Sequence, residues 1–249
     1  QPNFSWTQSI NHNLILLLLY ENIKEKDVFK HFNKLKKNET SDIPSLKIDE
    51  IEITQDDINS LFEYEQIEKL LKKINTKEEK FLEIGAGSGR TAKSILSIRN
   101  NVKYVIADIP PAINICLKNL KNFFPEKKIA LGYKFNKQND LNKILEENDI
   151  LFIFPHQITQ FSKKTFDISI AIDCLHEMEK NIIKKYMKNF EKVSKLLYFK
   201  VWEYAGLPYS FYQYYSVHRK EDYLINDSWK QHLKERCLYP SNFFQLAYE

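Results

Sequence analysis

A glycine-rich turn at residues 85–89 is the part of the sequence whose residue types and spacing point most directly to chemistry. Residues 81–84 form a short apolar run, predicted to be a strand, and Gly85-Ala86-Gly87-Ser88-Gly89-Arg90 follows it. Closely spaced glycines let a backbone approach a ligand, and the start of the next helix offers free N–H groups. The dinucleotide fingerprint Gly-x-Gly-x-x-Gly is not met, because Arg90 stands where its third glycine is required.

An acidic residue one strand later supports a nucleoside ligand. Asp108 ends the next predicted strand, residues 104–108, and lies 19 residues after Gly89. At that place a carboxylate can accept hydrogen bonds from both hydroxyls of a ribose. The alternative is that the glycines only form a tight turn and that Asp108 only caps a helix.

Glu83, the three glycines and Asp108 together resemble the first motifs of class I S-adenosylmethionine-dependent methyltransferases. The resemblance implies an α/β fold with a doubly wound, Rossmann-like, mostly parallel sheet of seven strands. It also implies S-adenosyl-L-methionine as the cofactor and S-adenosyl-L-homocysteine as the product. The cofactor-binding residues that it implies are Glu83, Gly85, Ala86, Gly87, Gly89, Asp108, Ile109, Pro155, Gln157 and Asp173.

The later motifs of this family can be placed on two further predicted strands. In the family the third strand ends near the adenine, and here residues 149–154 are followed by Pro155-His156-Gln157. The fourth strand, residues 166–172, is followed by Asp173-Cys174-Leu175-His176-Glu177-Met178. This segment resembles the family motif whose first residues face the methionine part of the cofactor and the substrate.

The order of motifs resembles, more narrowly, a group of bacterial sugar O-methyltransferases. This resemblance covers about residues 40–205, and its matching stretches are 51–71, 82–87, 107–110, 154–157 and 175–178. It implies methyl transfer to a hydroxyl of a sugar or sugar-like small molecule in bacterial surface polysaccharide biosynthesis. Ser88 and Arg90 depart from the aromatic and small residues expected in the turn, and His176 stands where Gln is more usual. The substrate can therefore differ from the family's typical sugar.

Methyl transfer to an alcohol is helped by a base, because a protonated hydroxyl is a poor nucleophile. His176 is the first candidate, since histidine titrates near neutral pH, and His156 is the second. Asp173 is a third candidate base and could equally hold the ammonium group of the cofactor. The alternative for either histidine is a purely structural role. A zinc-protease motif is excluded because Lys180 stands where the second histidine is required, and no metal site is expected, although a magnesium ion at Asp173 stays open.

The elements that must position these residues fall into two parts. Residues 1–75 are predicted to be a mostly helical cap that closes over the cofactor, with helices at 9–19, at 24–37 and from the Thr54 capping box to residue 71. Residues 76–249 are predicted to be the methyltransferase domain, with a substrate-side insertion at 206–235. Its predicted strands, which alternate with helices as in a parallel sheet, are residues 81–84, 104–108, 149–154, 166–172, 196–201 and 243–248.

The composition of the 249-residue chain is that of an ordinary globular protein, with 43% hydrophobic and 28% charged residues. The net charge of +4 is too small to imply a polyanionic partner, so nucleic acid is not an expected partner. Three widely separated cysteines favour a reducing, cytoplasmic location. The longest apolar run, residues 14–20, is too short for a membrane span, which needs roughly 20 residues. A homodimer is left open.

Three other functions remain open at this point. An RNA or other macromolecule methyltransferase would share the cofactor half, and an NAD-dependent nucleotide-sugar enzyme would share the strand-turn-strand opening. A non-catalytic module of the same fold is the third. The aromatic-rich residues 198–223 are predicted to line the substrate pocket in part, and His218, Arg219 and Lys220 there could either meet an anionic substrate or form a solvated cluster.

Overall fold

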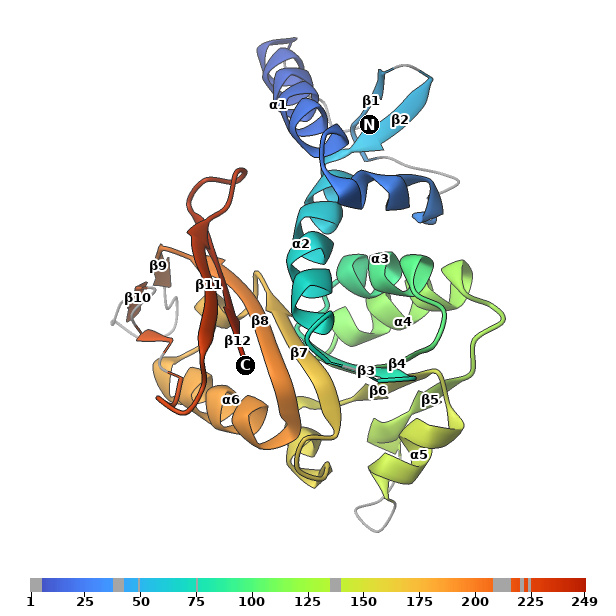
Figure 1. The fold of residues 1–249 in the computed structure, drawn as a ribbon, viewed down its shortest axis with the longest axis vertical. Helices are drawn as coiled ribbons and strands as arrows, with labels where there is room; N and C mark the ends of the chain where they lie inside the picture. The colour runs from blue at the N-terminus through green and yellow to red at the C-terminus, as the bar shows by residue number, and fades with distance from the viewer. Residues whose placement is uncertain are drawn as a thin grey trace. The chain divides into compact units, whose positions relative to one another are not determined.

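The computed structural model places helices and strands alternately along the chain (Figure 1). It describes residues 6–37, 43–48, 50–74, 76–134, 140–207, 216–219, 222–223 and 225–249. Contacts between residues divide the chain into two compact units, of which unit 1 holds residues 1–69 and 90–100 and unit 2 holds residues 70–89 and 101–249. The predicted division into a cap (1–75) and a methyltransferase domain (76–249) stays a prediction.

Unit 1 combines helices with a short hairpin. Its elements are α1 (Trp6–Lys24), the 3-10 helix η1 (Asp27–Lys34), β1 (Ser45–Ile48), β2 (Ile51–Thr54), most of α2 (Gln55–Leu71) and α3 (Arg90–Ile98). The hairpin pairs Leu46 with Ile53 in an antiparallel register. It was not predicted, because two four-residue strands are too short for a clear alternation of apolar and polar residues. The helix predicted at 24–37 is confirmed only in part: α1 ends at Lys24, and a separate 3-10 helix covers Asp27–Lys34.

Unit 2 is built on one eight-stranded sheet with the order β11-β12-β8-β7-β3-β4-β6-β5. Six neighbouring strands, from β8 to β5, run parallel, while β12 pairs antiparallel with β8 and β11 with β12. The mostly parallel, doubly wound sheet is therefore confirmed. The strands are β3 (Glu79–Ile84), β4 (Val102–Ala107), β5 (Ile129–Leu131), β6 (Ile150–Ile153), β7 (Phe166–Ile172), β8 (Ser194–Trp202), β11 (Gln231–Arg236) and β12 (Phe243–Tyr248).

The sheet has eight strands, whereas the resemblance implied seven and only six were placed on the sequence. The two strands that lie where none was expected are β5 and β11. β5 has only three residues, which gives no readable pattern. β11 is a mostly exposed edge strand with the polar sequence Gln-His-Leu-Lys-Glu-Arg, so it lacks the apolar alternation that marks a half-buried strand. Part of the insertion predicted at 206–235 is therefore a strand of the main sheet.

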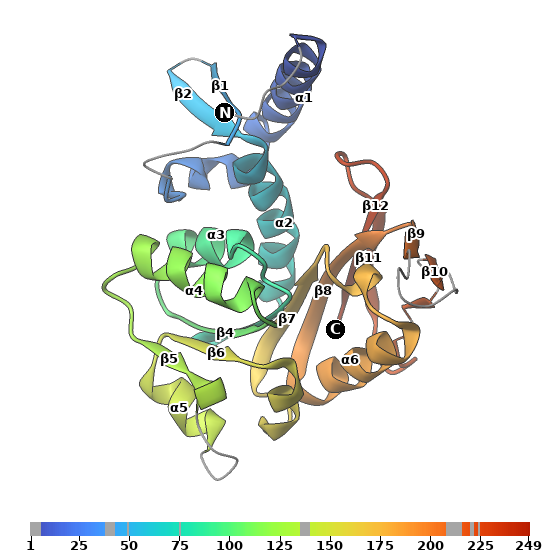
Figure 2. The ribbon, with the colours of Figure 1, turned by 180° about the vertical axis from the view of Figure 1, so that it is seen from behind.

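Helices cover both faces of this sheet. On one face α5 (Leu141–Glu147), the 3-10 helix η3 (Pro155–Gln160) and α6 (Lys180–Val193) pack their apolar side chains against β3, β4, β6, β7 and β8 (Figure 2). On the other face α4 (Ala112–Phe123) buries Cys116 and Leu120. Two further elements, β9 (Tyr204–Leu207) and β10 (Ser216–Arg219), form a separate antiparallel pair directly after β8.

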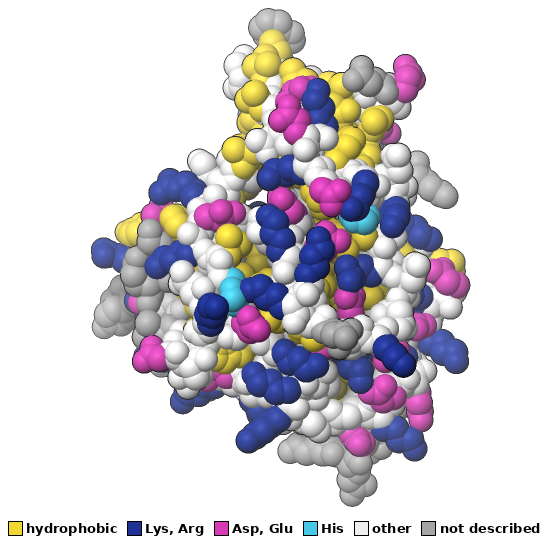
Figure 3. All heavy atoms as spheres, viewed as in Figure 1, with side chains coloured by type: hydrophobic (Ala, Val, Ile, Leu, Met, Phe, Trp, Pro, Cys, Tyr) yellow, Lys and Arg dark blue, Asp and Glu magenta, His cyan; other side chains and the backbone are white. Residues whose placement is uncertain are grey.

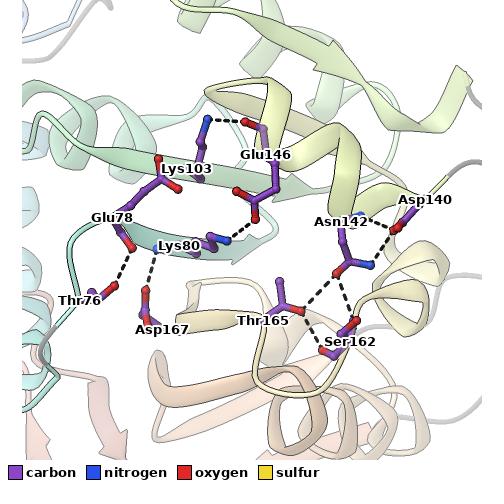
Figure 4. A network of polar contacts seen from close by, with 10 residues as sticks. All are labelled: Thr76, Glu78, Lys80, Lys103, Asp140, Asn142, Glu146, Ser162, Thr165 and Asp167. Atoms are coloured by element: carbon purple, nitrogen blue, oxygen red, sulfur yellow. Dashed lines mark hydrogen bonds and ion pairs between the residues drawn. The ribbon is translucent and has the colours of Figure 1, made fainter.

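The amino ends of the parallel strands are held by a network of polar contacts (Figure 4). The backbone N–H of Lys80 in β3 donates to Asp167 Oδ2 in β7 at 2.9 Å. Lys103 Nζ in β4 donates to the backbone oxygen of Glu146 at 3.0 Å, and Lys80 also pairs with the Glu146 carboxylate. These contacts join strands and helix α5 to one another. A ligand site of this kind of sheet is expected at the opposite edge, where the strands end at their carboxyl termini.

Candidate active site

The three glycines of the turn after β3 serve two different purposes. All three have positive φ angles: +66° at Gly85, +58° at Gly87 and +84° at Gly89. A Cβ atom at Gly85 would lie 2.6 Å from Cβ of Cys174, and one at Gly89 would lie 2.8 Å from Sγ of Cys116. A Cβ atom at Gly87 would meet no heavy atom within 4 Å. Gly85 and Gly89 therefore allow close packing, whereas Gly87 borders open space at the carboxyl end of β3.

Asp108, directly after β4, is tied to this turn. Its Oδ2 accepts the N–H of Gly87 at 2.9 Å, and its Oδ1 accepts the N–H of Ile109 at 2.7 Å. The side chain is 7% exposed. Each carboxylate oxygen keeps further acceptor capacity, because an ionised carboxylate offers about four lone-pair positions. The two backbone bonds thus fix a carboxylate at the edge of the open space beside Gly87.

Glu83 lies below the turn, inside the core. It is 2% exposed and its Oε2 accepts the hydroxyl proton of Tyr104 at 2.7 Å. Burial, and then the charge of Glu83, raise the pKa of Tyr104 well above its usual value, so the phenol stays protonated and keeps donating. Cofactor binding by Glu83 stays a prediction, and its structural role is to join β3 to β4.

The segment after β6 holds Pro155, His156 and Gln157. The Gln157 amide is 6% exposed and is used twice within the chain: Oε1 accepts the N–H of Phe154 at 2.8 Å, and Nε2 donates to the Gly132 oxygen at 3.1 Å. The Phe154 ring stacks on Tyr133 with centroids 4.8 Å apart. His156 is exposed. Gln157 therefore braces this corner, and cofactor binding by Pro155 and Gln157 stays a prediction.

Asp173, directly after β7, has an unusual backbone. Its φ angle is +57°, a conformation that is strained for a residue other than glycine and that recurs at functional sites. Its N–H donates to the Lys200 oxygen at 3.0 Å, and its Oδ2 lies 3.9 Å from Lys200 Nζ. Lys200 is 3% exposed and its ammonium lies 4.9 Å from the centre of the Phe243 ring. Lys200 was not among the predicted site residues, although a lysine within the apolar run of β8 is a signal that the sequence contains.

His176 lies on the 3-10 helix η4 (Leu175–Glu177) and is 5% exposed. Its ring stacks on Trp202 with centroids 5.4 Å apart and meets Phe243 edge-on at 5.8 Å. Its Nδ1 is buried without a hydrogen-bond partner. Burial, and then the charge of His218, lower the pKa of His176 to about 4, so the imidazole is neutral at pH 7 and can accept a proton.

The structure gathers the candidate residues at the carboxyl ends of four neighbouring strands, in the order β7, β3, β4, β6. Three strand spacings of about 4.8 Å put the ends of β7 and β6 about 14 Å apart. His176 after β7 and His156 after β6 therefore follow strand ends that lie well apart. Within the described ranges, no group of three His, Cys, Asp or Glu side chains is placed to hold a metal ion.

Arg90 has a structural partner within unit 1. Its guanidinium donates to both carboxylate oxygens of Glu63, at 2.8 and 3.1 Å, and to Ser60 Oγ at 3.0 Å. Such a bidentate pair is geometrically specific. The arginine that departs from the dinucleotide fingerprint is therefore used to join α3 to α2.

The insertion predicted at 206–235 is only partly described. Residues 208–215 and Lys220, which the aromatic-pocket and anion-binding hypotheses include, lie outside the described residues. His218 is 0% exposed, so it is not part of a solvated cluster.

Comparisons with known proteins support the fold. No protein-family model matches the chain, and no curated protein matches it. An S-adenosylmethionine-dependent methyltransferase from Clostridium acetobutylicum has a TM-score of 0.50 and 11% identity, over 75% of this chain and 89% of that one. Magnesium protoporphyrin IX methyltransferase from Synechocystis, solved with bound S-adenosylhomocysteine, also has a TM-score of 0.50 and 11% identity, over 92% of this chain and 95% of that one.

At this identity the likeness concerns the fold alone. The eight-stranded sheet and its flanking helices match the Rossmann-like fold of class I methyltransferases. This class of fold is therefore established for unit 2, whereas a fold alone does not define an activity.

Proposed function

We propose that the protein is an S-adenosyl-L-methionine-dependent O-methyltransferase that acts on a hydroxyl of a sugar or sugar-like small molecule in bacterial surface polysaccharide biosynthesis. The observation that carries the cofactor half is the carboxylate of Asp108, fixed by the N–H groups of Gly87 and Ile109 beside open space. A carboxylate that is held in place and can accept further hydrogen bonds, at this edge of such a sheet, suits the two hydroxyls of a ribose.

The other proposed cofactor contacts lie at the same edge of the sheet, where the parallel strands have their carboxyl ends. Gly87 has the room for a ligand to approach its backbone, and Ile109 is 62% exposed next to Asp108. Asp173, at the end of the adjacent strand, would hold the ammonium of the methionine part. The bound cofactor supplies the electrophilic methyl group, and the protein has to orient the acceptor oxygen toward it.

The acceptor half rests on His176 and its surroundings. Its neutral imidazole can take the hydroxyl proton, and the stack on Trp202 fixes the ring plane. Trp202 is 38% exposed, so part of this side chain is accessible beside the base. An aromatic face next to a neutral base suits an uncharged polyhydroxyl compound.

We also propose that two copies of the chain associate through α1. Ile10, Leu14, Leu17 and Leu18 on this helix are between 37% and 69% exposed, and hydrophobic side chains gather over α1 in Figure 3. Residues 6–20 include no Asp, Glu, Lys or Arg, so two such helices can meet without burying a charge. No described helix is long and apolar enough to cross a membrane.

Calorimetric titration with S-adenosylhomocysteine tests the cofactor half. We expect wild-type protein to bind it in the micromolar range, and Asp108→Asn to weaken binding at least about tenfold, since a tenfold loss is about 1.4 kcal/mol. Asp149→Asn is the matched control, because Asp149 also accepts a backbone N–H, that of Lys128 at 2.8 Å, but at the amino end of β6. Binding of NAD in place of S-adenosylhomocysteine would contradict the proposal.

A further inference from the structure

A second buried histidine lies near the proposed base. His218, in β10, is 0% exposed, and neither Nδ1 nor Nε2 of its ring has a hydrogen-bond partner. The Nδ1 of His176 is also buried without a hydrogen-bond partner. Buried polar atoms are almost always paired in folded proteins, so three unpaired imidazole nitrogens in one region need an explanation.

The topology brings these two rings together. β8 ends with Trp202, on which His176 stacks, and β9 begins two residues later at Tyr204. β9 packs against η4, which carries His176, and β10 returns along β9 with His218 opposite Ala205. The charge that His218 would carry is also one cause of the lowered pKa of His176, as expected for neighbouring rings.

The end of β10 is anchored rather than loose. Asp222 Oδ2 accepts the N–H of Arg219 at 2.9 Å, and it pairs with Lys180 Nζ, also at 2.9 Å. Lys180 opens α6, four residues after His176. This pair fixes the residue next to His218 to the element that follows His176, so both imidazoles are held in place.

The chemistry of two neutral imidazoles suits hydroxyl groups. Burial lowers the pKa of both rings, so each presents one N–H donor and one nitrogen acceptor at neutral pH. A hydroxyl is likewise both a donor and an acceptor. His31 also has two ring nitrogens without a hydrogen-bond partner, but its Nε2 lies 3.8 Å from the Glu68 carboxylate and its ring meets Tyr64 edge-on, within unit 1.

We propose that His218 is a second acceptor-binding residue, which hydrogen-bonds the hydroxyl next to the one that His176 deprotonates. The acceptor class is then an uncharged compound with two neighbouring hydroxyls, and Trp202 lies beside it. This inference rests on the proposed methyltransferase function, because it assigns the acceptor of that same site.

The test uses the full chain saturated with S-adenosylhomocysteine and labelled with 15N at histidine. The probes are methyl α-D-mannopyranoside, methyl α-D-glucopyranoside and the cyclohexane-1,2-diols, with cyclohexanol as the single-hydroxyl comparison. Two-dimensional spectra of the imidazole nitrogens report contact at each ring without turnover. We expect the His218 and His176 signals to shift when the diols or glycosides are added. The dissociation constants obtained from these shifts should be at least threefold lower than the one for cyclohexanol.

Two matched variants separate binding from folding. His218→Phe keeps the ring size and removes the unpaired nitrogens, so we expect an unchanged or higher melting temperature, unchanged affinity for S-adenosylhomocysteine and at least tenfold weaker diol binding. His31→Phe is the control and should leave diol binding unchanged. Unmoved His218 signals with every probe, or wild-type diol binding by His218→Phe, would overturn the inference. Loss of S-adenosylhomocysteine binding in the wild type would instead contradict the proposed function on which it rests.

Discussion

At the scale of single residues, the turn after β3 separates packing from ligand access. Gly85 and Gly87 share a positive φ angle, but a Cβ atom at Gly85 would strike Cys174 whereas one at Gly87 would enter open space. Cys174 itself is fixed, since its thiol donates to the Ile84 oxygen at 3.2 Å. The two glycines therefore offer a matched pair of substitutions with opposite consequences.

Gly85→Ala should lower the free energy of unfolding by about 2–4 kcal/mol, from about 1 kcal/mol of left-handed strain plus the overlap with Cys174. Gly87→Ala should lower it by only about 1 kcal/mol, because only the strain applies, yet it should weaken S-adenosylhomocysteine binding. Urea unfolding and calorimetric titration check both. Equal destabilisation by the two variants, with full ligand affinity in Gly87→Ala, would contradict this account.

The rate of methyl transfer should depend on pH through His176. A base with its pKa lowered to about 4 is already neutral at pH 6.5, so the rate should hold through that pH and fall only as the pH approaches 4. His176→Gln should lower the rate about 100-fold or more. A fall in kcat with its midpoint near pH 6.5 would show that the base is not His176 in the buried position described above.

At the scale of elements, α2 and α3 are joined by a buried charged pair. Glu63 on α2 and Arg90 on α3 form a bidentate contact, and the Glu63 side chain is 4% exposed. Removing one partner leaves a charge with little water around it, which is more harmful than removing both.

Glu63→Gln should therefore lower the free energy of unfolding by about 2–4 kcal/mol. The double variant Glu63→Met, Arg90→Met should recover a large part of that loss. Chemical denaturation of Glu63→Met, of Arg90→Met and of the double variant measures the coupling. Strictly additive effects would mean that the pair does not act as a unit.

Some of the strands could be predicted from the sequence, and others could not. Five of the six predicted strands were readable because each is a nearly continuous apolar run, as buried parallel strands require. The sixth, β12, pairs antiparallel with β8 and β11 and is also rich in apolar residues. The β1–β2 hairpin and the polar edge strand β11 lacked that signal. Asp108 and the glycine turn were readable because their spacing along the chain is local. The meeting of His176 with Trp202, and the burial of His218, depend on segments more than 25 residues apart, which no local pattern encodes.

At the scale of the whole molecule, buried histidines make stability depend on pH. His31, His176 and His218 all have pKa values lowered by burial, from an ordinary value of 6.5. In the unfolded chain they bind protons as the pH falls through 6.5, whereas the folded protein does not, so their contribution is complete above 6.5 and is lost toward pH 4. The melting temperature should fall across this window, and less steeply in His218→Phe. A flat profile in the wild type would contradict the assignment.

Association of two copies is the second prediction at this scale. Leu14→Lys and Leu18→Lys each place a charge in the exposed apolar stripe of α1, where the two residues are 53% and 69% exposed. Each should weaken self-association at least about tenfold in sedimentation equilibrium, about 1.4 kcal/mol. Ile115→Lys on α4, at a residue 50% exposed, is the control and should leave association unchanged. A wild-type chain that sediments as a monomer at every concentration would refute the α1 contact.

A crystal structure of the chain with S-adenosylhomocysteine would show directly whether the cofactor binds at Asp108. We predict that both ribose hydroxyls lie within hydrogen-bond distance of the Asp108 carboxylate and that the ligand passes close to the backbone of Gly87. We also predict that the sulfur atom of the ligand lies near the carboxyl end of β7, on the side of Asp173 and His176. A ligand bound elsewhere on the chain, or one whose ribose does not contact Asp108, would contradict the assignment of this edge of the sheet as the active site.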